Sequence, residues 1–380
     1  MKKKIVIIGA NDFQNKLIEK AKDLNYETHV FAWKDGSIGE KTADFFYPIS
    51  IIEKEKILEQ CKKIKPDGIC SIASDLATIT VNYVAEKLGL KGNPVSSTFQ
   101  CTNKYEMRKV FKENGIKTPK FIKTTSNFNK SKLNDFKFPL IVKPTDRSGS
   151  RGITKIYSME ELKKAIDYSV KDSFEKSAII EEYIEGNEYS CECISFNGKH
   201  YFLAFTKKFT TGAPNFIETG HVQPSDIDIS IQEKIKKEIF RALDALGIKN
   251  GASHTEFKID ENGTMIIIEI GARMGGDCIG SDLVYLSTGY DFVKMVIDVS
   301  VGLEPNFNIN TLPRKVAIKF LFNEKDLEEL ENLKVNKKIQ IYSISELNTS
   351  HMGNVVDSSS RLGYYIYFPT EGESKLWKRK

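Results

Sequence analysis

HTEFKIDENGTMIIIEIGARMGGD, residues 254–277, is an apolar segment that nevertheless contains two glutamates and an arginine. Its centre, Asn262-Gly263, is typical of a two-residue type I′ turn, because that turn needs positive φ at both central positions. The segment is therefore predicted to be a β-hairpin. A two-residue turn at this place puts Glu256 directly opposite Glu269 on the neighbouring strand.

The same register predicts which face of the hairpin lies in the core. It pairs Phe257 with Ile268 and Ile259 with Ile266, and side chains alternate between the two faces of a strand. The two glutamates then project from the other face. Because directly opposed like charges destabilise a strand pair, we expect a compensating cation between them. Mg²⁺ prefers oxygen ligands and commonly takes one or two carboxylates together with substrate phosphates. A solvated pair of glutamates with Lys258 nearby is the alternative.

Two other segments carry groups that suit a nucleotide. Lys143 ends an apolar strand, and the loop Ser148-Gly149-Ser150-Arg151-Gly152 follows it. Such a loop offers flexible backbone N–H groups and hydroxyls that can close over phosphates. A later strand ends in Glu181-Glu182-Tyr183-Ile184, whose main chain can meet an adenine edge, and Glu188 is placed to take ribose hydroxyls. Taken singly, these segments are also typical of a plain turn and a solvated strand end.

Length and composition describe a soluble chain of several domains. A length of 380 residues favours about two to three domains. No run of about 18 apolar residues is present, which argues against a membrane span. The net charge is +5 and the lysines are spread along the chain, so a nucleic-acid surface is not indicated. The six cysteines include no CxxC pair, which predicts reduced thiols, no zinc site and a cytoplasmic protein.

Strand and helix patterns alternate through the first hundred residues, which predicts a parallel sheet covered by helices. The turn Ile8-Gly9-Ala10-Asn11 lacks the full G-x-G-x-x-G pattern of dinucleotide binding and is predicted to be an ordinary tight turn.

Taken in chain order, these segments resemble the ATP-grasp superfamily over most of the chain. The segments that carry the resemblance are Asn103-Lys104-Tyr105-Glu106-Met107-Arg108, Gly115 to Pro119, Ile141-Val142-Lys143-Pro144, Ser148 to Gly152, Glu181 to Glu188, Glu256, and Glu269-Ile270-Gly271-Ala272-Arg273. The sequences from Glu269 to Asp277 and from Phe216 to His221 resemble those of the carboxylate-amine ligases that join amino acids or form dipeptides. Carbamoyl-phosphate-synthase-like proteins share the resemblance more distantly.

The resemblance implies an α/β and α+β architecture. We expect an N-terminal, Rossmann-like parallel-sheet domain (pre-ATP-grasp) over residues 1–102 and a lid region over 103–190. A large lobe with the metal site would cover 191–310, and a small C-terminal α+β subdomain 311–380. The nucleotide would lie between the lid and the large lobe.

The resemblance also implies roles for individual residues. Arg273 would neutralise the transferring phosphoryl group, and Glu256 and Glu269 would bind Mg²⁺, as one or two ions, with Mn²⁺ as an alternative. The residues implied to bind ATP are Lys104, Lys143, Ser148, Gly149, Ser150, Gly152, Glu181, Glu182, Ile184 and Glu188. Lys143 is included among the catalytic residues as well.

Several positions carry open alternatives. Many family members have Asn where this chain has Gly271, so either water or Asp277 would complete the metal shell. His221 has a side chain suited to taking a proton from an ammonium group, but a solvent-exposed loop histidine is the other interpretation. His254 is expected to hydrogen-bond behind the site rather than contact substrate. The neighbours Lys207 and Lys208, taken together, either approach phosphate or are a solvated pair.

The implied reaction is ATP-dependent activation of a small carboxylate to an acyl phosphate, followed by attack of an amine to form an amide. Partners would be these small molecules, with no nucleic acid and no membrane, and a homodimer is left open. One alternative is a carboxylating enzyme that uses bicarbonate, like carbamoyl-phosphate synthase or purine-pathway relatives. Others are a nucleotide-binding module without turnover, suggested by Gly271, and, more remotely, a nicotinamide oxidoreductase, suggested by Ile8-Gly9-Ala10.

Overall fold

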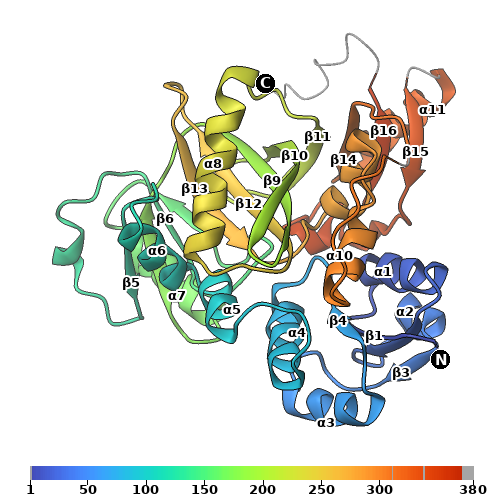
Figure 1. Ribbon diagram of the computed structural model, residues 1–380. Helices are drawn as coiled ribbons and strands as arrows, with labels where there is room; N and C mark the ends of the chain where they lie inside the picture. Colours follow the sequence, from blue (N-terminus) through green and yellow to red (C-terminus); the bar gives the residue numbers. More distant parts are fainter. Residues whose placement is uncertain (1, 310, 337–338, 370–380) are drawn as a thin grey trace.

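Residues 2–309, 311–336 and 339–369 are described by a computed structural model (Figure 1). An N-terminal four-stranded parallel sheet has the order β3-β2-β1-β4. Its strands are β1 Lys4–Ile8, β2 Glu27–Phe31, β3 Phe45–Tyr47 and β4 Gly68–Cys70. The surrounding helices are α1 Asp12–Asp23, α2 Ile38–Thr42, α3 Lys54–Ile64 and α4 Asp75–Leu88. Buried residues of β1 alternate between two cores: Ile5 and Ile7 pack with α1, while Val6 and Ile8 pack with α3 and α4. Such alternation is expected of a sheet covered on both faces.

A small four-stranded sheet of order β5-β8-β6-β7 follows two connecting helices. The helices are α5 Val95–Thr102 and α6 Lys104–Glu113, and the strands are β5 Phe121–Thr124, β6 Leu140–Pro144, β7 Thr154–Ile156 and β8 Ala178–Glu182. A 3-10 turn, η1, spans Lys130–Leu133, and α7, Leu162–Asp172, packs its apolar side on β6 and β8.

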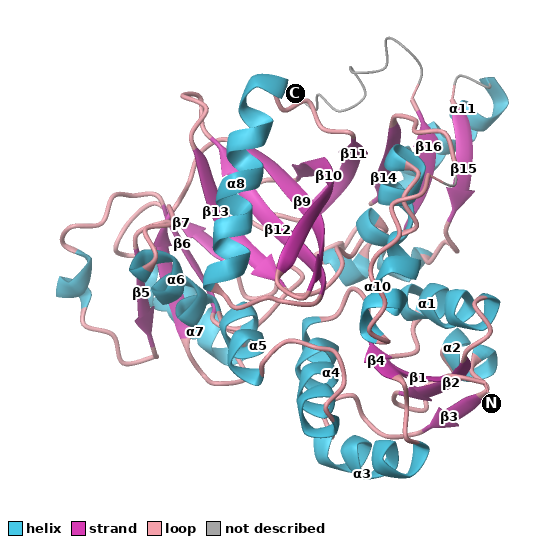
Figure 2. Ribbon diagram, in the orientation of Figure 1, coloured by secondary structure: helices cyan, strands magenta, loops and turns pink. Residues whose placement is uncertain are grey.

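The large sheet contains eight antiparallel strands in the order β13-β12-β9-β10-β11-β14-β16-β15 (Figure 2). Its first five strands in chain order are β9 Asn187–Phe196, β10 Lys199–Thr210, β11 Glu218–Gln223, β12 Gly251–Ile259 and β13 Met265–Gly271. The C-terminal strands are β14 Val316–Leu321, β15 Gln340–Ile344 and β16 Gly363–Phe368. These last strands join the sheet through the β11–β14 pair, so the predicted C-terminal subdomain shares its sheet with the predicted large lobe.

Helices lie on both faces of the large sheet. They are α8 Ile229–Ala245, η2 Ile279–Leu283 (a π-helical turn), α9 Val284–Thr288, α10 Phe292–Ser300 and α11 Glu324–Asn336, with 3-10 turns η3 Thr349–His351 and η4 Ser358–Ser360. Helix α10 contacts β4 of the N-terminal sheet and also β9 and β12 of the large sheet. It therefore joins the two sheets in one apolar core.

The predicted fold class, α/β and α+β, is confirmed by these sheets. The domain boundaries at residues 102, 190 and 310 stay a prediction. Residue 1 of the predicted N-terminal domain, residue 310 of the predicted large lobe, and residues 337–338 and 370–380 of the predicted C-terminal subdomain lie outside the described residues.

The hairpin prediction is confirmed near the glutamates and wrong near the turn. Glu256 pairs with Glu269 as expected. The turn is longer than predicted: Asp260 N donates to Thr264 O at 3.1 Å, and Gly263 alone of the Asn-Gly pair has positive φ, +72°. This is a three-residue loop with a left-handed glycine.

A bulge between Glu256 and Phe257 then restores the predicted register. Between the turn and the bulge, Phe257 pairs with Ile267 instead of Ile268, and Ile259 pairs with Met265 instead of Ile266. Ile267 is fully buried, whereas Ile268 is only partly buried. The bulge therefore moves Ile268 out of the core.

All six cysteines are free and buried. Within the described ranges, every helix is too short or too polar to traverse a bilayer.

Candidate active site

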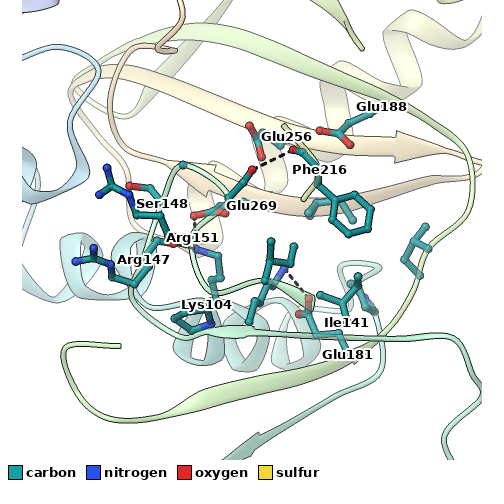
Figure 3. Close-up of a pocket in the computed structure, with 18 of the residues that line it drawn as sticks. Lys104, Ile141, Arg147, Ser148, Arg151, Glu181, Glu188, Phe216, Glu256 and Glu269 are labelled. Atoms are coloured by element: carbon teal, nitrogen blue, oxygen red, sulfur yellow. Dashed lines mark hydrogen bonds and ion pairs between the residues drawn. The ribbon is translucent and has the colours of Figure 1, made fainter. Parts of the chain in front are cut away.

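A cavity lies where the small sheet faces the β12–β13 hairpin (Figure 3). Of the predicted site residues, it is lined by Lys104, Lys143, Ser148, Gly149, Ser150, Glu181, Glu182, Ile184, Glu188, Glu256, Glu269 and Arg273. Gly152 and His221 are not among its lining residues. Segments more than a hundred residues apart in sequence thus converge on one space.

One part of the cavity is apolar. Ile141 on β6 and Ile268 on β13 both line it, together with Tyr183 and Phe216. Figure 3 shows Ile141 beside Glu181, and Phe216 across the cavity on the side of Glu188 and Glu256. Ile268 reaches the cavity because of the bulge described above, a feature that strict alternation did not predict. These walls suit a flat apolar ring, because binding pockets combine apolar walls with a few polar groups.

The two opposed glutamates are each paired with a buried cation. Lys104 Nζ lies 2.9 Å from Glu269 Oε1 and 2.7 Å from Arg147 O. Lys208 Nζ contacts Glu256 Oε1 and has Glu188 at 3.6 Å and Glu218 at 3.7 Å. The solvated interpretation of Lys208 is wrong, because its side chain is only 3% exposed. In this structure, two lysines therefore supply the positive charge that was expected beside the two carboxylates.

A histidine lies behind Glu256. His254 Nε2 is 3.2 Å from Glu256 Oε1, and its Nδ1 contacts Glu192 Oε1. Burial lowers the pKa of His254, but Glu192 and Glu256 outweigh burial and raise it to about 9. Burial likewise opposes ionisation of Glu256, but Lys208 and His254 hold its pKa well below the ordinary value. Glu256 is thus available as an anion.

The carboxylates fit a divalent ion shared with a nucleotide. In the part of the chain that is described, no group of three or more His, Cys, Asp and Glu side chains is arranged to hold a metal ion. Two opposed carboxylates supply hard oxygen donors, which is the share of the shell that Mg²⁺ usually takes from a protein when phosphates supply the rest. Glu256 and Glu269 therefore fit such an ion.

Lys143 and Glu181 form a buried ion pair. Lys143 Nζ lies 2.7 Å from Glu181 Oε2, and Arg108 Nε lies 2.6 Å from Glu181 Oε1. Burial raises the pKa of Glu181, but Arg108 and Lys143 outweigh it and lower the pKa to about 2. Burial also lowers the pKa of Lys143, and Glu181 opposes that shift. The anion keeps the Lys143 ammonium at the cavity wall.

The glycine loop closes over one end of the cavity. Gly149 and Ser150 have positive φ, +73° and +58°, and Ser150 Oγ donates to Phe216 O at 3.0 Å. This bond ties the loop to the chain before β11. Gly152, φ +69°, packs against Pro144, where an added Cβ would lie 2.7 Å from the ring. Gly152 therefore shapes the loop from behind.

Arg273 is held by an aspartate that the sequence did not single out. Arg273 Nε lies 2.8 Å from Asp75 Oδ1, and its Nη2 lies 3.2 Å from Asp75 Oδ2. Asp75 begins α4, so the N-terminal domain orients an arginine in the cavity. A Cβ at Gly271 would lie 3.2 Å from both Arg273 Nε and Asp75 Oδ1. The ion pair thus occupies the space into which a side chain at position 271 would extend.

Asp277 and His221 lie away from the cavity. Arg361 Nη2 and Nη1 contact the two oxygens of Asp277 at 2.6 and 3.0 Å, so this carboxylate is paired with the C-terminal segment. Asp277 does not line the cavity, which disfavours it as a substitute metal ligand. His221 lies on β11 with no exposed surface, its Nε2 3.9 Å from Asp277 Oδ2. Its ring packs edge-on to Phe320. His221 is therefore not a solvent-exposed loop histidine.

Part of the chain that carries this site is similar to a known protein family. Residues 136–282 match the model of the ATP-grasp domain. An alanine–anticapsin ligase of Bacillus subtilis is 29% identical over 302 residues, which cover 70% of this chain and 63% of that protein. A carbamoyl phosphate synthase large chain of Thermotoga petrophila is 24% identical over 294 residues, 73% of this chain and 26% of that one. The chain thus spans less than two thirds of the length of these relatives.

Among solved structures, an L-amino acid ligase from Bacillus licheniformis superposes with a TM-score of 0.80 at 23% identity. The match covers 99% of this chain and 95% of that one. The predicted resemblance to ATP-grasp proteins is confirmed.

Proposed function

We propose, from the premise that residues 136–282 form an ATP-grasp domain, that this protein is an ATP-dependent carboxylate-amine ligase. Its substrates would be amino acids or similar small molecules, joined through an amide. The observation that carries the proposal is the pair Glu256 and Glu269, held face to face in a cavity that also gathers Lys104, Lys143 and Arg273.

The cavity residues divide into base-binding and phosphate-binding groups. Ile141 and Ile268 would enclose the adenine beside the Glu181 to Ile184 backbone, with Glu188 at the ribose. Lys104, Lys143 and the Ser148 to Gly152 loop would meet the phosphates. Glu256 and Glu269 would hold Mg²⁺, which would neutralise negative charge on the phosphates.

Phosphoryl transfer needs positioning and charge neutralisation more than a protein nucleophile. A carboxylate oxygen of the first substrate attacks the γ-phosphorus, the bond to the bridging oxygen breaks, and ADP leaves. The amine of the second substrate then attacks the acyl carbon, the bond from that carbon to the phosphate oxygen breaks, and the proton lost by the nitrogen leaves with the phosphate as the amide forms. Arg273 would stabilise the negative charge that develops on the transferring group. His221 receives no role in proton transfer, because its ring is buried away from the cavity.

Two named relatives favour amino acids as substrates. The alanine–anticapsin ligase and the L-amino acid ligase both have names that specify amino-acid joining. The carbamoyl phosphate synthase match keeps a bicarbonate-dependent carboxylating reaction as the second candidate.

The deciding experiment is a pairwise amino-acid screen that measures ADP and phosphate release and identifies products by mass spectrometry. We expect release that requires two substrates and yields an amide. Release that requires bicarbonate and not an amine would favour the second candidate. ATP binding without ADP formation across the screen would reject both in favour of a binding module.

A further inference from the structure

Glu192 is a fully buried carboxylate behind the candidate metal site. It lies on β9, with 0% exposure, in register with His254 on β12. It does not line the cavity, so it has no direct access to a nucleotide. Burying a charged group is costly unless hydrogen bonds satisfy it. Its two oxygens therefore need partners within the protein.

Each oxygen of Glu192 binds a different part of the site. Oε1 contacts His254 Nδ1, and His254 Nε2 lies 3.2 Å from Glu256 Oε1. Oε2 accepts a hydrogen bond of 2.9 Å from Gly275 N. Gly275 lies two residues beyond Arg273, in the turn that follows β13. One carboxylate thus connects a candidate metal ligand with the main chain after the candidate catalytic arginine.

The contact at Gly275 is tightly packed. A Cβ added there would lie 2.8 Å from His254 Nδ1 and 3.0 Å from each oxygen of Glu192. Glycine at this position lets the backbone come close enough to donate to the carboxylate. Because charge-assisted hydrogen bonds are stronger than neutral ones, this contact is well suited to hold the turn.

We propose that Glu192 is a positioning residue that fixes Glu256, through His254, and the Arg273–Gly276 turn relative to each other. The inference rests on the proposed function, since it takes Glu256 as a ligand of a nucleotide-bound metal ion. Residues that orient metal ligands from behind typically change metal affinity about 10- to 100-fold when they are replaced. Glu192 would do so while also ordering the turn.

Three variants separate the two connections. Glu192→Ala removes both. Glu192→Gln keeps an oxygen that can accept from Gly275 N and an amide group that can meet His254. His254→Gln leaves the Glu192 bond to Gly275 and changes only the connection to Glu256. Asp298→Asn is a matched control, because Asp298 is a buried carboxylate, 5% exposed, that pairs with Lys294 on α10 outside the cavity.

Two readouts are measured on the full chain. The first is binding of Mn²⁺ in the presence of ADP, followed by electron paramagnetic resonance. The second is hydrogen exchange in peptides that contain Gly275. We expect Glu192→Ala to weaken Mn²⁺ binding at least about tenfold and to speed exchange at the turn. Glu192→Gln should remain within about threefold of wild type in Mn²⁺ affinity, with the turn protected. His254→Gln should weaken Mn²⁺ binding with the turn still protected, and Asp298→Asn should change neither.

Wild-type Mn²⁺ affinity in Glu192→Ala, or unchanged exchange at Gly275, would overturn the inference. If Glu192→Ala does not fold, Mn²⁺ binding by His254→Gln tests the connection to the metal ligand. Hydrogen exchange at the turn is then compared in two variants: it should stay slow in Glu192→Gln and become faster in Gly275→Ala, whose added Cβ would displace the turn from Glu192. Failure of the wild-type protein to bind Mn²⁺ with ADP would instead count against the proposed function. Exchange at Gly275 would still report on the bond from Glu192 to the turn.

Discussion

Replacing Asp75 tests how the N-terminal domain supports the cavity. Asp75→Asn keeps the size of the side chain but removes the charge that pairs with Arg273. The side chains of the pair are 19% and 16% exposed, so the arginine would be left mostly desolvated without its counter-ion. Because the pair joins α4 to the turn after β13, we expect both stability and turnover to fall.

The magnitude follows from burial. Breaking a buried ion pair by removing one partner costs about 3–5 kcal/mol, and the partial exposure of this pair reduces that to about 2–3 kcal/mol. With roughly 2 °C of melting temperature per kcal/mol in a chain of this size, Asp75→Asn should melt about 4–6 °C below wild type. Asp75 also lies in the first turn of α4, where a carboxylate contributes about 0.3–1 kcal/mol through the helix dipole.

Thermal unfolding followed by fluorescence measures the change, with Asp12→Asn as the matched control. Asp12 lies in the first turn of α1 and is exposed, so its replacement reports the helix-end contribution alone. The double variant Asp75→Asn with Arg273→Met should recover most of the lost stability, because no unpaired charge remains, but no turnover. A melting temperature for Asp75→Asn equal to that of Asp12→Asn would refute the buried-pair reasoning.

Three further predictions concern single residues. The pKa of His254 is raised to about 9 in the fold, against about 6.5 when unfolded. Its protonated ring therefore stabilises the fold fully below pH about 6.5, and this contribution disappears as pH rises through about 9. The melting-temperature difference between wild type and His254→Gln should shrink across that window, and a constant difference would contradict the assignment. Gly271→Asn should lower turnover about tenfold in steady-state kinetics, because the added Cβ would lie 3.2 Å from both Arg273 Nε and Asp75 Oδ1. Faster turnover would show that asparagine is accommodated at this position. Gly152→Ala should cost more than about 1 kcal/mol in thermal unfolding, because φ is +69° and the proline ring at the end of β6 lies 2.7 Å from the added Cβ; an unchanged melting temperature would argue against the strain.

The sequence predicts the strand geometry of the site better than it predicts which distant residues pair with the site residues. Opposition of Glu256 and Glu269 follows from strand alternation and a short turn, and it is observed. The bulge that brings Ile268 into the cavity was not predictable from the Asn262-Gly263 signal, because a three-residue loop and a compensating bulge give the same register at the glutamates.

Contacts between distant elements were also beyond the sequence. Asp75 is 198 residues from Arg273, and spacing along the chain does not reveal such a pair. The same limit applies to Lys208 and His221: the sequence left solvent exposure open for both, but both side chains lie inside the molecule. A signal was present for Asp75, since an acidic residue after Ser74 is typical of a helix start at a strand end, but that position alone indicates only a cap.

The central claim, that Glu256 and Glu269 together hold a nucleotide-bound divalent ion, is tested most directly by crystallography with ADP and Mn²⁺. An anomalous difference map recorded at the manganese edge should contain a peak within about 2.5 Å of an oxygen of each glutamate, next to the ADP phosphates. A peak that contacts neither carboxylate, with ADP bound in the cavity, would contradict the account.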